Sequence, residues 1–146
     1  MGCPFITCAI QRKGVEFCWE CEEHPTCEKW RNHREAGKKG DSFTCYQTLE
    51  EDIACIGTYG VGEFDRIQIT RGTFLKEMLQ EFNEGRSKSY YCIACTLLST
   101  DELGEAMEKA GQASEGLSRK EKSRVLHALI DEIARRRKYH VKLRKG

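Results

Sequence analysis

The sequence predicts a mostly helical protein with a cysteine-rich, loop-rich metal-binding cap at its N-terminus. Five of the nine cysteines fall within the first 27 residues, among glycines and prolines that favour turns. The rest of the chain has apolar residues at helical spacing and two signatures of helix starts. We therefore expect a cysteine-rich metal-binding head over residues 1–35 and a helical domain over residues 42–146. The two are either packed as one compact unit or joined through a hinge at residues 36–42.

Length and composition are those of one soluble globular domain. The chain has 146 residues, of which 39% are hydrophobic and 32% charged. No apolar stretch approaches the roughly 18 residues that cross a membrane. The N-terminal segment MGCPFITCAI lacks the regions of a signal peptide, and Ile6 stands where myristoylation requires Ser or Thr. We therefore expect a cytoplasmic protein without membrane contact.

Two helices and a turn are expected in the first half of the chain. The polar segment 28–41 begins as a short helix that Gly37 and Gly40 are expected to end. Residues 45–56 place aliphatic side chains at helical spacing, and GTYGVG at 57–62 then predicts a turn that breaks the helix. The glycines of that turn match neither the dinucleotide-binding motif nor the phosphate-loop motif, so no nucleotide site is predicted there.

Apolar residues predict two more helices in the middle of the chain. Between Phe74 and Phe82 they recur at one, three and four residues, which marks one face of a helix, and Gly85 is the expected C-terminal cap. Residues 87–99 are almost wholly apolar at their centre, which fits a buried helix or a strand. Their alanine and paired leucines favour a helix.

Two capping boxes predict the last two helices. Ser99 with Glu102, and Ser118 with Glu121, each place a hydroxyl where it accepts a free N–H of the first turn and a carboxylate that reaches back. The end of the chain, YHVKLRK at 139–145, alternates like a short strand or an extended tail.

The C-terminal region is strongly basic. From Arg119 to Gly146 there are eleven Lys or Arg and three Asp or Glu, whereas the whole chain has a net charge of only +1. The segment RRRKYHVKLRK at 135–145 could bind the phosphates of a nucleic acid while Tyr139 or His140 stacks on a base. A solvated tail is the favoured interpretation, because the rest of the chain is acidic. The tail could also contact that acidic body.

The cysteine pattern of the head indicates a bound metal. An odd number of cysteines without a secretion signal argues against a disulfide framework. Cys18 and Cys21 form a C-x2-C pair, and this spacing lets one turn direct both sulfurs at a single ion. Zinc needs four such ligands. The candidates are Cys3, Cys8, Cys18, Cys21 and Cys27, with His24 able to replace one sulfur.

Other uses of these thiols stay open. A four-iron cluster takes the same ligands, although the spacing matches neither common ferredoxin motif. A thioredoxin-like redox pair needs a C-x-x-C between a strand and a helix, and this sequence does not predict such a junction. Free buried cysteines are the remaining alternative, although Trp19 and the glutamates beside it favour an exposed loop.

A second C-x2-C pair, Cys92 and Cys95, lies in an apolar segment. Core packing is its favoured role, because a buried cysteine behaves as a small hydrophobe. If Cys45 and Cys55 converge on this pair, the four would form a second metal site. His127 is flanked by apolar residues and is expected to be a satisfied core or edge residue.

The segment CPFITCAIQRKGVEFCWECEEHPTCEKW resembles a cysteine-rich family, domain of unknown function 3795, whose members are small cytoplasmic proteins of anaerobic bacteria and archaea. The matching positions are Cys3, Cys8, Ala9, Lys13, Gly14, Cys18, Cys21 and Cys27. Residues 81–98 resemble a later segment of the family, so the resemblance covers most of the chain. The chain departs from the family where Thr26 separates Pro25 from Cys27. The resemblance implies metal binding by the cysteines and supplies no reaction.

Together these features predict a small metal-binding protein, more readily a binding protein than an enzyme. Zinc in a structural role is the expected cofactor. The first alternative is an iron–sulfur or thiol-redox protein that carries electrons or assists an anaerobic enzyme. The second is an adaptor that binds nucleic acid or an unknown protein partner through its basic tail.

Overall fold

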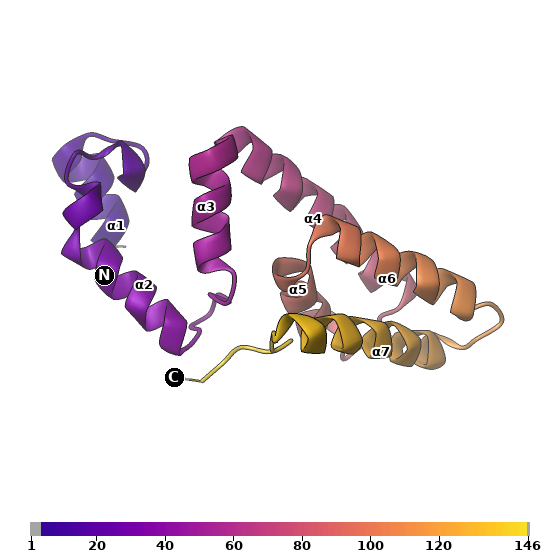
Figure 1. The fold of residues 1–146 in the computed structure, drawn as a ribbon. Coiled ribbons are helices and arrows are strands. Elements are labelled where there is room, and N and C mark those ends of the chain that lie inside the picture. The colour runs from indigo at the N-terminus through magenta and orange to yellow at the C-terminus, as the bar shows by residue number, and fades with distance from the viewer. Residues whose placement is uncertain (1–3, 146) are drawn as a thin grey trace. The chain divides into compact units, whose positions relative to one another are not determined.

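The protein divides into two compact units, Met1–Lys39 and Gly40–Gly146, in a computed structural model that describes residues 4–145 (Figure 1). No strand occurs in residues 4–145, and most of them lie in helices, which confirms the mostly helical class. Cys3, a predicted ligand, lies outside the described residues.

The first unit, hereafter the head, consists of short helical turns followed by one regular helix. Its elements are α1 (Pro4–Ile6), the π-helix η1 (Thr7–Lys13), the 3-10 turns η2 (Cys18–Glu20) and η3 (His24–Thr26), and α2 (Glu28–Lys39). The loops and turns expected for this region are therefore partly helical. Gly14, with φ 66°, ends η1 in the left-handed conformation that glycine adopts without steric cost.

The second unit, hereafter the helical unit, contains the five longer helices. They are α3 (Leu49–Tyr59), α4 (Val61–Glu81), α5 (Lys88–Leu97), α6 (Thr100–Ala113) and α7 (Arg119–Arg137). In Figure 1, α6 and α7 run side by side, and both α5 and α6 pack against α4. The extended tail that follows α7 confirms one of the two conformations expected for the last residues.

Glycines end helices at fewer places than the sequence predicts. Gly37 lies inside α2, where it is buried, so the prediction that it ends the helix is wrong. Gly60 alone, with φ 86°, separates α3 from α4, and α4 therefore starts at Val61, well before the predicted face. Gly85 lies in the loop beyond Phe82, the residue that caps α4. A glycine in a helix costs only about 1 kcal/mol, so tertiary packing can retain it there.

Both predicted capping boxes are confirmed. The Ser99 hydroxyl accepts the Glu102 N–H at 3.2 Å, and the Glu102 carboxylate accepts the Ser99 N–H at 2.9 Å. Ser118 and Glu121 make the same pair of bonds at 3.4 and 2.9 Å. Helices α6 and α7 therefore start at the residues that the sequence indicates.

The helical unit has one hydrophobic core, built between α4, α5, α6 and α7. Its buried members are Met78, Phe82, Tyr91, Ala94, Cys95, Leu98, Leu103, Ala106, Met107, Ala110, Leu126, Ile130 and Ile133. All of them come from the helices, or the residues just after them, that the apolar pattern predicts. The head, in contrast, has one buried hydrophobic residue among those whose burial is described, Ala9.

The basic tail is anchored to the start of its own unit. The Asp41 carboxylate, whose side chain is fully covered, accepts the Arg144 backbone N–H at 2.7 Å and the Arg144 guanidinium at 2.9 Å. Gln47 bonds both backbone groups of His140, and the Tyr139 hydroxyl donates to the Glu51 carboxylate at 2.9 Å. The tail is therefore held against its own body, one of the contacts that its charge predicts.

Candidate metal centre

Four of the predicted ligands line one small cavity in the head. Cys8, Cys18, Cys21 and Cys27 surround about 40 Å³ of space, together with His24. Each of these thiols is half-buried and reduced. The cavity therefore brings together, from separate elements, four of the five cysteines that the sequence predicts to bind metal.

Tight turns position the three later cysteines. Cys18 starts η2, and its carbonyl accepts the Cys21 N–H at 3.2 Å, which closes the turn within the C-x2-C pair. The Cys21 carbonyl in turn accepts the His24 N–H at 2.9 Å, and the Cys27 N–H bonds the His24 carbonyl at the start of α2. The Glu20 carboxylate fixes the approach to η2 by accepting the backbone N–H groups of Glu16 and Phe17, each at 2.9 Å.

One ion pair lies at the edge of the cavity. The Lys13 ammonium donates to the Glu23 carboxylate, and both residues line the cavity. This hydrogen bond is the main cause that raises the pKa of Lys13, and the nearby thiols of Cys8 and Cys21 add to it.

The arrangement of the ligand atoms is not that of a closed metal site. Within residues 4–145, no three side chains among His, Cys, Asp and Glu lie close enough together to hold a metal ion. Cys3 lies outside these residues and is therefore not among the side chains compared. The cysteines therefore share a cavity, and a metal would have to draw their sulfurs inward.

The second C-x2-C pair belongs to the core. Cys95 is buried, with its sulfur 3.7 Å from the Met78 sulfur, and burial raises the pKa of its thiol to about 12. A thiol with that pKa stays protonated at neutral pH and is a poor metal ligand. The core-packing role is confirmed for Cys95. The described residues also give no metal-ready group around Cys45, Cys55 and Cys92.

A buried polar network between α5 and α7 was not predicted. The Ser87 hydroxyl lies 2.9 Å from His127 Nε2 and 3.2 Å from the Ser123 hydroxyl, which in turn lies 3.1 Å from the Tyr91 hydroxyl. The Tyr90 ring stacks on His127 at 3.8 Å. His127 is thus a satisfied residue at the edge of the core, as the sequence predicts. The feature of the sequence that could have predicted this network is Ser123, a polar residue on the apolar face of its helix.

This network also places a serine and a histidine beside a cavity of about 420 Å³. The Ser87 hydroxyl donates to the Glu84 carboxylate at 3.0 Å, so its lone pairs are left to accept from His127 and Ser123. In that arrangement His127 is a donor to the serine and not a base that removes its proton. The network therefore joins two helices and does not activate a nucleophile.

The stability of the protein should decrease as the pH falls through the titration of His127. Burial lowers the pKa of this imidazole, although Asp131 and Glu84 oppose the shift. The unfolded chain therefore binds a proton at His127 more readily than the folded protein does. The contribution of neutral His127 to the free energy of unfolding is complete above the ordinary histidine pKa of about 6.5, and it is lost as the pH falls through the lowered pKa of the folded protein. Urea unfolding between neutral and mildly acidic pH should give a shallower pH dependence for His127→Gln than for the wild type. Parallel curves would contradict this prediction.

Comparison with known proteins gives no match: the chain matches no described protein family, no curated protein and no solved structure. Within residues 4–145, no helix has both the length and the apolar character needed to cross a bilayer. The candidate site thus rests on the residues and contacts of this chain.

Proposed function

We propose that the protein is a small metal-binding protein whose head holds one zinc ion in a structural role. The ligands would be four of Cys3, Cys8, Cys18, Cys21 and Cys27, with His24 as a replacement for one sulfur. We propose membership of the cysteine-rich family that these residues resemble on the same basis. A zinc ion bound there would supply cross-links between loops, because thiolates hold it in a closed tetrahedron.

The observation that carries this proposal is that the head has several cysteines around one cavity but almost no hydrophobic core. Four cysteines line one cavity, yet Ala9 is the one buried hydrophobic residue among the head residues whose burial is described. Units below about 40 residues cannot bury enough apolar surface to fold alone and usually need disulfides or a metal. No disulfide joins the described cysteines, so we propose a metal as the cross-link of this unit.

The size of the cavity favours a single ion over an iron–sulfur cluster. Its volume is about 40 Å³, and one water-sized body needs roughly 10–15 Å³ of such space. A lone zinc ion is small enough for a space of this volume, provided that the sulfurs are drawn inward around it. A cluster of four irons and four sulfides would require the turns around Cys18 and Cys27 to move apart.

Elemental analysis of protein purified without oxygen tests the proposal, together with its visible absorption spectrum. We expect one zinc per chain and no colour. Iron with matching sulfide and brown colour would replace zinc with a cluster and move the function to electron transfer. Protein that binds neither metal, even after zinc is added to the reduced chain, would overturn the metal-binding function.

The tail alternative has less support. Arg144 and Arg137 pair with Asp41 and Glu102 of the same unit, so part of the tail's charge is already neutralised. A nucleic-acid adaptor acting through the tail would have to bind with the remaining cations.

A further inference from the structure

We propose that the helical unit binds a phosphate-bearing ligand in an open pocket at the C-terminal end of α7, apart from the metal centre of the head. The pocket has a volume of about 580 Å³, within the range of small-ligand pockets. It is formed by the last turns of α7, the tail that follows α7 in Figure 1, and one side chain of α5. Its principal lining residues are Tyr90, Asp131, Arg135, Lys138, Tyr139 and Lys142.

Three cations line this pocket, and their charges are not neutralised within the chain. Arg135, Lys138 and Lys142 form no ion pair with a carboxylate of residues 4–145. The ion pairs in this part of the chain use two other cations, Arg137 and Arg144. The cations of the pocket are therefore available to a ligand.

The charge of the lining fits a phosphate better than a carboxylate. The one carboxylate among the lining residues is Asp131, which already accepts the Tyr90 hydroxyl at 2.6 Å. The lining thus carries three positive charges against one negative charge. A phosphate monoester carries about −1.5 to −2 at neutral pH, which matches this excess, whereas a carboxylate carries only one negative charge. The Arg135 guanidinium can also bind two phosphate oxygens at once.

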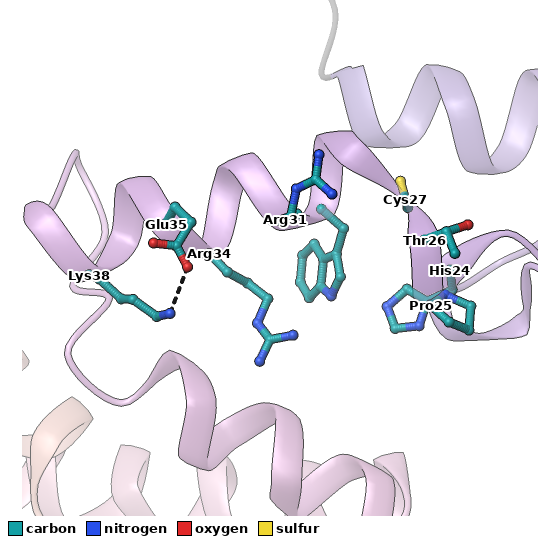
Figure 2. A pocket seen from close by; sticks show the side chains of 9 residues that line it. His24, Pro25, Thr26, Cys27, Arg31, Arg34, Glu35 and Lys38 are labelled. Atoms are coloured by element: carbon teal, nitrogen blue, oxygen red, sulfur yellow. Dashed lines mark hydrogen bonds and ion pairs between the residues drawn. The ribbon is translucent and has the colours of Figure 1, made fainter.

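The cations beside α2 in the head differ in this respect. Figure 2 shows Lys38 joined to Glu35 by an ion pair, and the Arg31 guanidinium lies 3.9 Å from the Glu28 carboxylate. An anion that binds there would compete with these carboxylates. The cations at the end of α7 are for that reason the better candidates for binding an anion.

Aromatic side chains favour a phosphate that is part of a larger organic ligand. Tyr90 and Tyr139 line the pocket and are half-buried. Their hydroxyl groups already donate to Asp131 and Glu51, so a ligand would meet mainly their rings. A nucleotide, free or within a nucleic acid, combines a phosphate with a flat base that packs against such rings.

The part of the tail that carries Lys142 has a fixed backbone. The Gln47 side chain accepts the His140 N–H at 2.9 Å and donates to the His140 carbonyl at 2.8 Å. Beyond Lys142, the Arg144 N–H donates to the Asp41 carboxylate at 2.7 Å. Lys142 lies between these two anchors, so its backbone position is set before a ligand binds. This preorganisation lowers the entropy cost of binding.

Lys138 occupies a backbone position that glycine usually takes. It follows Arg137, the last residue of α7, with φ 59° and ψ 30° in the left-handed region. Its N–H bonds the Arg135 carbonyl at 3.2 Å and closes the end of the helix. Glycine adopts this conformation without steric strain, so a lysine here costs some stability. Such strain is common where a side chain serves a binding site.

Binding of phosphate ligands to the full chain tests the proposal. The probe is a fluorescently labelled single-stranded oligonucleotide of about ten nucleotides, with ATP and inorganic pyrophosphate as competitors. If the three cations contact phosphates, the logarithm of the binding constant should fall against the logarithm of salt concentration with a slope of about −2. Displacement by ATP or pyrophosphate would support a small phosphorylated ligand. Binding of the oligonucleotide without displacement would support the same pocket acting on nucleic acid.

Lys138→Gly separates a binding role from a structural one. The change removes one cation and also the strain of the left-handed backbone, so the urea midpoint should rise while oligonucleotide binding weakens about tenfold. Lys142→Gln should weaken binding by a similar factor without this rise. Each change should make the salt slope shallower by about 0.7.

Lys122→Gln is the matched control, because it removes one charge from the same helix outside the pocket lining. Lys122 is roughly 24 Å from Lys138 at 1.5 Å per helical residue, well beyond the screening length of about 8 Å at physiological salt. Its replacement should change affinity by no more than about twofold.

Three outcomes would overturn the proposal. The first is that the chain binds none of the three phosphate ligands. The second is that Lys138→Gly and Lys142→Gln leave binding unchanged, and the third is that Lys122→Gln weakens binding as much as they do. None of these measurements depends on zinc content, so failure of this proposal is distinguishable from failure of the proposed metal-binding function.

Discussion

Cys18→Ser is expected to abolish metal binding and to unfold the head while the helical unit stays folded. A serine hydroxyl is not a zinc ligand at neutral pH, and three remaining thiolates bind zinc much more weakly than four. In zinc-finger peptides a structural zinc supplies roughly 10–16 kcal/mol of apparent binding free energy, which is also folding free energy. The head has one buried hydrophobic residue, Ala9, among those described, so little buried apolar surface would hold it.

Metal analysis combined with hydrogen exchange read by mass spectrometry measures both parts of this expectation. Zinc should fall from one per chain to near zero, and amide protection should be lost over residues 4–39 and retained in α4–α7. Cys92→Ser is the matched control, because it makes the same chemical change at a half-buried cysteine of α5. The control should keep its zinc. If Cys18→Ser keeps both zinc and protection in the head, the cysteine cavity is not the metal site.

Addition of a strong chelator to the wild-type protein tests independently whether metal binding stabilises the fold of the head. When the chelator removes the metal, the cysteine sulfurs are no longer coordinated. They should then react with thiol reagents. Cys8, Cys18, Cys21 and Cys27 should react, whereas buried Cys95, whose pKa is raised to about 12, should not. A difference in reactivity between these two sets separates loss of the head's fold from global unfolding.

The regular helices could be predicted because their signals are local. Ser99 and Ser118 mark the starts of α6 and α7 by side-chain bonds within one turn. The spacing of apolar residues identifies the faces that build the core. The position of Gly37 inside α2 could not be predicted, because a glycine costs a helix only about 1 kcal/mol and the burial of Gly37 depends on the tertiary fold.

The candidate site was predictable in composition and not in geometry. The C-x2-C pair names Cys18 and Cys21 as partners, since a turn of that length is local. Placement of Cys8 at the same cavity depends on η1 folding back toward η2, and the sequence carries no periodic signal for a π-helix. The Ser87–His127 bond likewise joins residues on two helices that only tertiary packing brings together.

Leu126→Ala is expected to destabilise the helical unit by about 2–5 kcal/mol without loss of zinc. Leu126 is fully buried on α7 and belongs to the core that α4, α5 and α6 complete. Truncation removes three carbons from a packed site, so the transfer free energy of those atoms is lost and a cavity is left. Ile69→Ala on α4 is the matched control, because that side chain is 71% exposed and should cost no more than about 0.5 kcal/mol.

Equilibrium urea unfolding of both variants, followed by circular dichroism at helical wavelengths, measures the difference. All described members of the core lie between residues 74 and 141, so the loss of stability should appear in the helical unit and zinc content should stay at one per chain. Equal midpoints for Leu126→Ala and Ile69→Ala would show that α7 does not complete the core. Loss of zinc from Leu126→Ala would show that the head depends on the helical unit for its stability, contrary to a head that folds around its own metal.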